Sequence, residues 1–228
     1  MSFDHRLDNV IDEQPFPLLF ITVSGAHLYG FASEDSDYDL RGIHLLDTKR
    51  VLGLQSLKET VEVSKDVDGL EIDLVTHDAG KFFRMLLKRN GYVLEQIFSP
   101  LVLRGGPVLE ELRVLAKGCI TRHHNHHYLG FLETQRRLFQ KEAAVGAPRI
   151  KPLLYMYRVV LTGIHLNQTG EVEANLARLG EIHELSFLAD LIERKVHGSE
   201  HGVMEPADLS FHETQIDRLE AILRGHRA

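Results

Sequence analysis

Residues 18–40 read Leu-Leu-Phe-Ile-Thr-Val-Ser-Gly-Ala-His-Leu-Tyr-Gly-Phe-Ala-Ser-Glu-Asp-Ser-Asp-Tyr-Asp-Leu. The short apolar run Leu18–Val23 predicts a buried strand, and Ser24-Gly25 predicts a turn directly after it. Asp37 and Asp39 follow a second glycine, and in an extended chain residues two apart point the same way. Two carboxylates held together are costly unless a cation or a shared proton relieves their repulsion. Beside a glycine turn whose backbone N–H groups can approach phosphate, this pattern indicates a site for Mg²⁺ and a nucleotide.

A third acidic position lies on a neighbouring predicted strand. Asp39–Leu46 predicts the second strand, and Leu70–Thr76 alternates strictly between two faces, which predicts a third strand beside it. Glu71 and Asp73 share one face of that strand. Asp73, at the centre of the apolar run, is favoured as the partner of the first two carboxylates, and Glu71 at the strand's edge is its competitor. Three carboxylates from two neighbouring strands are what a pair of Mg²⁺ ions needs in phosphoryl transfer.

The remaining segments predict a hairpin and then helices. Val61–Val67 is the expected hairpin partner of the third strand, with Asp68-Gly69 as a two-residue turn. His77-Asp78 precedes an apolar stripe with basic residues outside it, which predicts a capped helix, and a short helix is expected over Tyr92–Phe98. Beyond the Gly105-Gly106-Pro107 break, periodicity predicts helices over Val108–Ala116, Thr121–Glu142, Pro152–Gln168, Leu176–Val196 and Phe211–Arg224, the last opened by a capping box at Ser210-Phe-His-Glu213. The chain is therefore predicted to be α/β in its first half and helical in its second.

The composition excludes several classes of protein. A chain of 228 residues with 43% hydrophobic and 26% charged residues is an ordinary globular protein. The formal net charge of −7 argues against non-specific coating of nucleic acid and still permits a local basic groove. Cys119 is the single cysteine, which excludes an intrachain disulfide and fits a reducing cytoplasm. The N-terminus has no signal-peptide layout and no apolar run reaches about 18 residues. A cytoplasmic protein without membrane association is therefore expected.

The glycine and aspartate motifs together resemble a known signature. Gly25-Ala-His-Leu-Tyr-Gly30, followed by Asp35-Ser-Asp-Tyr-Asp-Leu40, is similar to the Gly-Ser turn, second glycine and Ser-Asp-x-Asp-Leu of the DNA polymerase β nucleotidyltransferase superfamily. More narrowly, these motifs and the stretch around Phe83–Glu95 resemble a bacterial branch of predicted, minimal-type nucleotidyltransferases. The resemblance covers residues 18–100 and extends more loosely over Lys151–Gly170.

The resemblance implies a fold and a division of the chain. The superfamily fold is a small mixed β-sheet flanked by helices, of class α/β or, more strictly, α+β. Here a helical C-terminal part would follow it. Residues 1–118 are expected to form the catalytic core. Residues 119–228 are expected to form a helical domain that provides a wall for the acceptor or the nucleotide.

The resemblance also assigns roles to individual residues. Asp37 and Asp39 match two metal-binding carboxylates, and Asp73 matches the third, which bridges the metals and activates the attacking hydroxyl. Ser24 and Gly25 match the turn that holds the β- and γ-phosphates of the nucleotide. Two ions of Mg²⁺ (or Mn²⁺) are thereby implied as cofactors, and an NTP is implied as the substrate.

Residues around this core have both a functional and a structural interpretation. Ala26 stands where the family usually has Ser, which removes one hydroxyl contact to phosphate that the preceding Ser24 could replace. His27 and Tyr29 either contact the nucleotide or pack the turn. Arg41 either neutralises triphosphate charge or pairs with an acidic neighbour.

The helical half offers further candidates. Lys151, Tyr155 and Arg158 recur on one face of a predicted helix, where they either bind the triphosphate or an RNA end or form a solvated face with the tyrosine half buried. The His123–His127 cluster contains no Cys and has no His-Glu-x-x-His spacing, so a polar or substrate-stacking surface is favoured over structural zinc. Cys119 is expected to be an inert core thiol.

The implied reaction moves a nucleoside monophosphate from an NTP to an acceptor hydroxyl and releases pyrophosphate. An RNA 3′ end, a protein side chain (adenylylation) and a small molecule are all acceptors that this core can serve. The alternative is a catalytically silent interaction protein or antitoxin-like partner, which would keep the sheet and bind neither metal nor NTP. Base preference and oligomeric state have no recognisable pattern in the sequence.

Overall fold

The computed structural model describes residues 3–54, 56–197, 204 and 206–225. The chain forms two compact units: the first comprises the residues up to Leu28 together with Asp35–Cys119, and the second comprises Tyr29–Glu34 together with the residues from Ile120 onward. The division after Cys119 lies one residue from the predicted boundary. The grouping of Tyr29–Glu34 with the second unit was not predicted.

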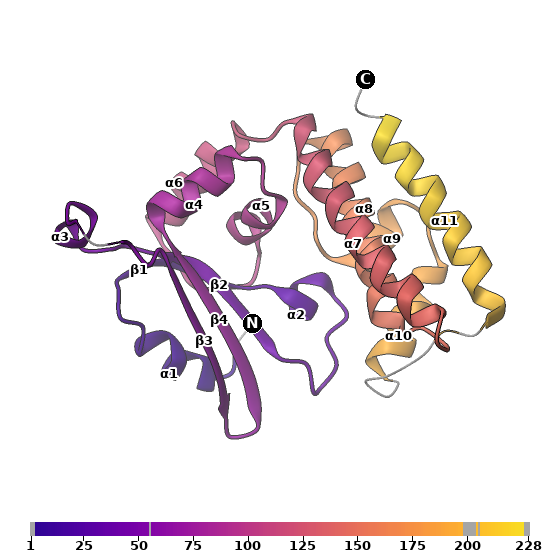
Figure 1. Ribbon diagram of the computed structural model, residues 1–228, viewed down its shortest axis with the longest axis horizontal. Coiled ribbons are helices and arrows are strands. Elements are labelled where there is room, and N and C mark those ends of the chain that lie inside the picture. The colour runs from indigo at the N-terminus through magenta and orange to yellow at the C-terminus, as the bar shows by residue number, and fades with distance from the viewer. Residues whose placement is uncertain (1–2, 55, 198–203, 205, 226–228) are drawn as a thin grey trace. The chain divides into compact units, whose positions relative to one another are not determined.

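The first unit is built on a five-stranded mixed sheet (Figure 1). Its order is β3-β4-β2-β1-β5, in which β2 and β4 run parallel and the other neighbours run antiparallel. The strands are β1 (Leu18–Val23), β2 (Tyr38–His44), β3 (Thr60–Val67), β4 (Leu70–Asp78) and β5 (Val102–Arg104). The predicted fold class and the first four strands are confirmed, and β5 is an addition that the sequence did not reveal.

The β3–β4 hairpin has the predicted two-residue turn. Asp68 and Gly69 both have positive φ values, 52° and 77°. This is the combination that a tight hairpin turn requires, and glycine reaches it without strain. The turn fixes the register of β4, and therefore the position of Asp73 in the sheet.

Helices cover both faces of the sheet. On one face α1 (Arg6–Asp12) buries Leu7, Val10 and Ile11 against side chains from β1, β2 and β4. On the other face Phe82 of α4 (Ala79–Leu87) packs edge-on against Phe20 of β1, and α5 (Gly91–Phe98) follows. The remaining helices of this unit are α2 (Gly25–Tyr29), whose last residue groups with the second unit, α3 (Thr48–Val51) and α6 (Pro107–Lys117).

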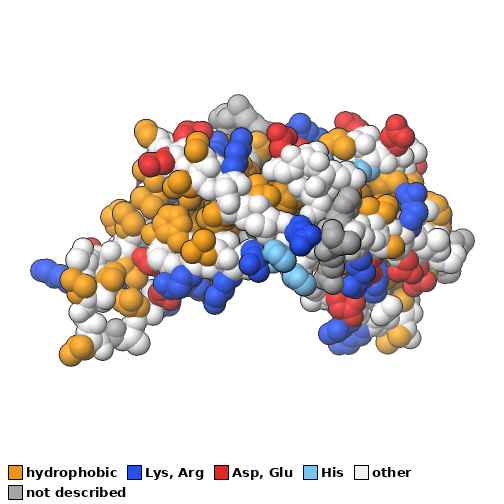
Figure 2. Space-filling model, turned by 90° about the horizontal axis from the view of Figure 1, so that it is seen from above, with side chains coloured by type: hydrophobic (Ala, Val, Ile, Leu, Met, Phe, Trp, Pro, Cys, Tyr) orange, Lys and Arg blue, Asp and Glu red, His pale blue; other side chains and the backbone are white. Residues whose placement is uncertain are grey.

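The apolar stripe predicted on α4 is only partly buried. Phe82 and Leu86 face the core, whereas Phe83 and Leu87 are exposed. Figure 2 shows hydrophobic side chains gathered on the exposed surface of the first unit. Burial of two positions, reinforced by the Asp78 cap, is therefore what holds this helix on the sheet.

The second unit consists of helices around a buried central one. Fifteen of the twenty residues of α8 (Ile150–Thr169) are buried. The surrounding elements are the 3₁₀ turn Arg122–His124, α7 (Asn125–Ala143), α9 (Leu176–Ile182), α10 (Phe187–Val196) and α11 (Pro206–Gly225). A helix that is buried on nearly all sides is predominantly apolar around its circumference, as α8 is.

Two predictions for this unit are wrong. The single helix over Leu176–Val196 is two helices, because Glu184 adopts φ 55° and ends the first one. The second helix packs near Gly180, where an added Cβ would meet the Leu188 side chain at 3.4 Å, an ordinary contact distance. The capping box at Ser210 is also absent, because α11 already begins at Pro206, a residue suited to the first turn.

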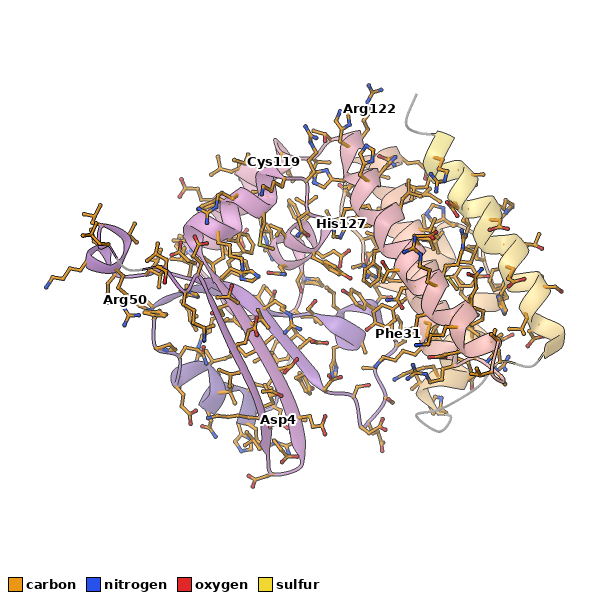
Figure 3. All side chains as sticks on the ribbon, viewed as in Figure 1. Asp4, Phe31, Arg50, Cys119, Arg122 and His127 are labelled. Carbon is orange, nitrogen blue, oxygen red and sulfur yellow. The ribbon has the colours of Figure 1, made fainter. Side chains whose placement is uncertain are left out.

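Cys119 is not a core thiol. It is half-buried at the end of the first unit, with its Sγ 3.8 Å from the Leu115 carbonyl oxygen (Figure 3). None of the helices in the described part of the chain combines the length and hydropathy needed to cross a bilayer.

Candidate active site

The turn after β1 is anchored on both sides. The Ser99 hydroxyl donates to the Val23 carbonyl at 3.1 Å, and the Val23 N–H donates to the Leu101 carbonyl at 2.9 Å. The Ser24 N–H in turn donates to the backbone carbonyl of Asp39 at 2.7 Å. The start of the glycine turn is therefore fixed directly beside the central acidic residue of β2.

Gly25 is required by its conformation and by its neighbour. Its φ is +60°, a region that side chains rarely adopt, and an added Cβ would lie 1.9 Å from Oδ2 of Asp39. Gly25 opens the short helix α2, whereas the sequence predicted only a turn. The missing side chain leaves the space that the Asp39 carboxylate occupies.

The structure brings Asp39 and Asp73 side by side. They are register partners on the parallel strands β2 and β4, and Asp37 immediately precedes β2. Leu40 and Leu74, the next residue on each strand, lie in the core under α1. Because successive side chains alternate, Asp39 and Asp73 both point to the opposite face.

Glu71 lies differently from its competitor. It is exposed and pairs in register with Asp66 on β3, whereas Asp73 is half-buried. Glu71 is the second residue of β4 and faces solvent, which favours Asp73 as the third carboxylate of the site.

Arg41 closes over this acidic pair. One guanidinium nitrogen, Nη2, donates to Oδ1 of Asp39 at 2.5 Å. The other, Nη1, donates to the backbone carbonyl of Asp73 at 2.6 Å and to that of Leu40 at 2.9 Å. Of the two interpretations of Arg41, the ion pair is the one present in this structure.

The electrostatics of the pair reflect its crowding. Burial raises the pKa of Asp39 above its usual range, the Arg41 charge opposes this rise, and the charges of Asp37 and Asp73 add to it. Burial is the largest of these causes, so the raised pKa reflects desolvation first and the neighbouring acidic charges second.

The donor set fits Mg²⁺ or Mn²⁺ in its chemistry. Carboxylate oxygens are the ligands that these hard cations prefer, and three acidic residues supply them. Among the residues that the structure describes, however, no three His, Cys, Asp or Glu side chains lie close enough to hold one metal ion. Oδ1 of Asp39 is bonded to Arg41 instead. The side chains would have to move before these carboxylates could share a cation.

His27 and Tyr38 form a stacked pair beside the acidic residues. Their ring centroids are 4.0 Å apart with an interplanar angle of 22°. Tyr38 was not predicted as a site residue, and its position between the two aspartates of the motif is the signal that could have identified it. Packing of the turn is the role of His27 that the geometry shows.

The candidates of the second unit are not all on a solvated face. Lys151 is exposed and Tyr155 is half-buried, whereas Arg158 is completely buried with its guanidinium carbon 4.0 Å from the ring centre of Tyr29. Tyr155 packs edge-on against Tyr29 and against Phe31, which is labelled in Figure 3. Tyr29 therefore belongs to an aromatic cluster around Arg158, and nucleotide binding by these residues stays a prediction.

The histidine cluster is also mixed. His123 and His126 are exposed with their rings 6.3 Å apart, whereas His124 is buried and bonds to Thr121. Burial, followed by the charge of Arg158, lowers the pKa of His127 to about 4. The polar surface predicted for the cluster therefore includes only His123 and His126.

Known proteins resemble this chain along most of its length. It is 31% identical over 197 residues to the uncharacterized protein MJ0002 of Methanocaldococcus jannaschii, covering 85% of this chain and 76% of the relative. It is 24% identical over 212 residues to the uncharacterized protein YcgL of Bacillus subtilis, covering 89% and 79% of the two chains. A nucleotidyltransferase-like protein from Exiguobacterium sibiricum aligns structurally over 95% of this chain and 72% of its own, at 13% identity and a TM-score of 0.35.

A family model identifies the chain more directly. The model for RlaP, described as the RNA repair pathway DNA polymerase beta family, matches residues 2–225. Together with the relative from Methanocaldococcus jannaschii, this match covers both the acidic site and the helical unit. This protein therefore belongs to the RlaP family of DNA polymerase beta-like nucleotidyltransferases.

Proposed function

We propose that this protein transfers a nucleoside monophosphate from an NTP to an acceptor hydroxyl in a reaction that depends on Mg²⁺ or Mn²⁺. The acceptor oxygen forms a bond to the α-phosphorus, and the bond from that phosphorus to the bridging oxygen breaks, which releases pyrophosphate. The observation that carries the proposal is the pairing of Asp39 and Asp73 on adjacent parallel strands, beside a glycine that leaves room for the carboxylate.

Each residue of the site has a defined task in this proposal. Asp37 and Asp39 hold the cations, which neutralise the charge that develops on the triphosphate. Asp73 activates the acceptor hydroxyl for attack. The turn at Ser24 and Gly25 cradles the phosphates through the Ser24 hydroxyl and the Gly25 N–H, because the Ser24 N–H already donates to the Asp39 carbonyl. The work of the site is thus positioning and charge neutralisation.

An RNA 3′ end is the acceptor that the family description favours, because that description places the family in an RNA repair pathway. A net charge of −7 does not oppose recognition of a single terminus, which requires few phosphate contacts. Protein side chains and small molecules are the other acceptors to be compared with it.

The test is incubation with each of the four α-labelled NTPs, Mg²⁺ or Mn²⁺, and RNA with a free 3′ hydroxyl, a protein mixture or a small-molecule panel. Asp39→Asn and Asp73→Asn should each lower transfer by about 100-fold or more. Glu71→Gln is the matched control, since it removes a carboxylate from the same strand two residues away and should leave the rate unchanged.

Equal rates for the wild type and both aspartate variants on every acceptor would contradict the enzymatic proposal. The catalytically silent alternative also predicts that Mn²⁺ with NTP leaves the melting temperature unchanged. A binding-competent enzyme must show an increase, because ligands that bind the native state stabilise it.

A further inference from the structure

The Arg41 guanidinium lies where a cation would relieve the acidic pair. We propose that Arg41 is a built-in counter-ion, which occupies the cation position at Asp39 in the metal-free protein and competes with a divalent cation for that carboxylate. The inference rests on the proposed function, because it takes Asp39 to be a ligand of that cation.

The two oxygens of the Asp39 carboxylate have different surroundings. Oδ2 lies in the space that Gly25 leaves, where an added Cβ would be 1.9 Å away. Oδ1 accepts from Nη2 of Arg41 at 2.5 Å. Oδ1 is therefore the oxygen that becomes available when Arg41 leaves, while Oδ2 stays beside the glycine turn.

Arg41 is held in this place by the sheet itself. Its Nη1 reaches across from β2 to the Asp73 carbonyl on β4 at 2.6 Å, so the side chain spans the two acidic strands. The planar fork of the guanidinium allows one nitrogen to bond to the carboxylate while the other bonds to the backbone. A lysine could supply the charge in this position and could not reproduce that fork.

The contact can also be displaced. The side chains of Arg41 and Asp39 are 23% and 22% exposed, so solvent and solutes can reach the pair. One positive charge faces three carboxylates here, since Asp37 and Asp73 also act electrostatically on Asp39. A divalent cation compensates more of this charge than a guanidinium does, which favours exchange.

This competition unites the two interpretations of Arg41. While Arg41 is bound to Asp39 it stabilises the metal-free site, and once released it is a free cation beside the acidic residues. A released guanidinium in that position suits the anionic triphosphate that arrives with the metal. The ion pair and the nucleotide contact are then successive states of one side chain.

The first experiment measures Mn²⁺ affinity without nucleotide, from the electron paramagnetic resonance signal of free Mn²⁺ and by titration calorimetry. Arg41→Met keeps most of the side-chain volume and removes the charge, so it should bind Mn²⁺ about tenfold more tightly than the wild type. Arg84→Met is the matched control, because Arg84 is an exposed cation of the same unit that pairs with Glu59. Its affinity should equal that of the wild type.

The second experiment uses the unaltered protein, so it does not depend on the folding of a variant. In ¹⁵N NMR spectra the Arg41 guanidinium should rotate slowly without metal, because three hydrogen bonds hold it. Saturating Mg²⁺ should accelerate that rotation.

The outcomes separate this inference from the function on which it rests. Mn²⁺ binding that is equal or weaker in Arg41→Met, or Arg41 rotation that Mg²⁺ does not change, overturns the inference and leaves the metal-dependent enzyme intact. Absence of Mn²⁺ binding in both the wild type and Arg41→Met overturns the inference, and the enzyme is then decided by the transfer assay with NTP. Tighter binding in Arg41→Met, together with no nucleotidyl transfer by the wild type on any acceptor, supports the counter-ion and contradicts the enzyme.

Discussion

Gly25→Ala should push the Asp39 carboxylate out of the position that it occupies beside the glycine turn. The added methyl group would lie 1.9 Å from Oδ2 and 2.8 Å from Cγ of Asp39. Ordinary contact begins near 3.4 Å, so either the carboxylate or the turn must move by about 1.5 Å. The turn is bonded to β2 through the Ser24 N–H, which leaves the carboxylate as the more mobile partner.

The magnitude has two parts. An L side chain in the left-handed region costs roughly 1–2 kcal/mol. Overfilling a packed position costs a further 1–3 kcal/mol, roughly. For a chain of this length each kcal/mol lowers the melting temperature by about 2–4 °C. Under the proposed function, displacing the Asp39 carboxylate by more than 1 Å should also lower kcat/KM by about 100-fold.

Gly69→Ala is the matched control. Gly69 belongs to the same unit and has φ +77°, yet nothing lies within 4 Å of an added Cβ. This variant therefore carries only the backbone strain and should lose about 2–8 °C while retaining full activity. Thermal unfolding and nucleotidyl transfer on both variants complete the comparison. The reasoning is refuted if Gly25→Ala keeps wild-type activity, or if the two variants match in both measurements.

Three further outcomes are expected. Asp78→Ala, which removes the carboxylate that accepts from a first-turn N–H of α4 at 2.9 Å, should cost about 1 kcal/mol in chemical denaturation, whereas Asp78→Asn should recover most of it. Arg158→Met should lower the free energy of unfolding by about 2 kcal/mol, because it removes a buried guanidinium stacked on Tyr29. Lys151→Met on the exposed surface should change the free energy of unfolding by less than about 0.5 kcal/mol, and equal losses would contradict the burial of Arg158. His127 is held neutral with a pKa lowered to about 4, so its contribution to stability is present above pH 6.5 and is lost as the pH falls toward 4; His127→Gln should flatten the melting-temperature profile in that interval.

The sheet could be predicted because its strands carry local signals. β1 and β4 are short apolar or alternating runs bounded by turn residues, and the Asp68-Gly69 turn sets the hairpin between β3 and β4. The sequences of α1 and β5 carry no local signal strong enough to predict these two elements. A seven-residue helix is not stable in isolation, and α1 forms because its three apolar residues pack on the sheet.

The errors in the helical unit have a related origin. Helical periodicity continues across the break between α9 and α10, so the sequence alone predicts one helix. The break coincides with the left-handed conformation of Glu184. A residue other than glycine rarely adopts this conformation, and a periodic pattern does not reveal it.

The carboxylates of the site were predictable, and their surroundings were not. Alternation along β4 and the Asp-x-Asp spacing place the acidic residues on one face, and the parallel register of β2 and β4 agrees. Neither pattern reveals whether Arg41 turns toward Asp39 or toward solvent, because a long side chain has many rotamers of similar energy. The burial of Arg158 was equally hidden, since a basic residue at helical spacing is usually on a solvated face.

Asp39 connects the separate motifs into one geometric unit. Its backbone carbonyl accepts from Ser24, its Oδ2 needs the space that Gly25 leaves, and its Oδ1 accepts from Arg41. A larger residue at position 25 would move the carboxylate, and a neutral residue at position 41 would leave three acidic groups without their counter-charge. The Ser-Gly turn and the Asp-Leu-Arg strand therefore need each other, because the fold must hold this carboxylate in place before any cation or nucleotide binds.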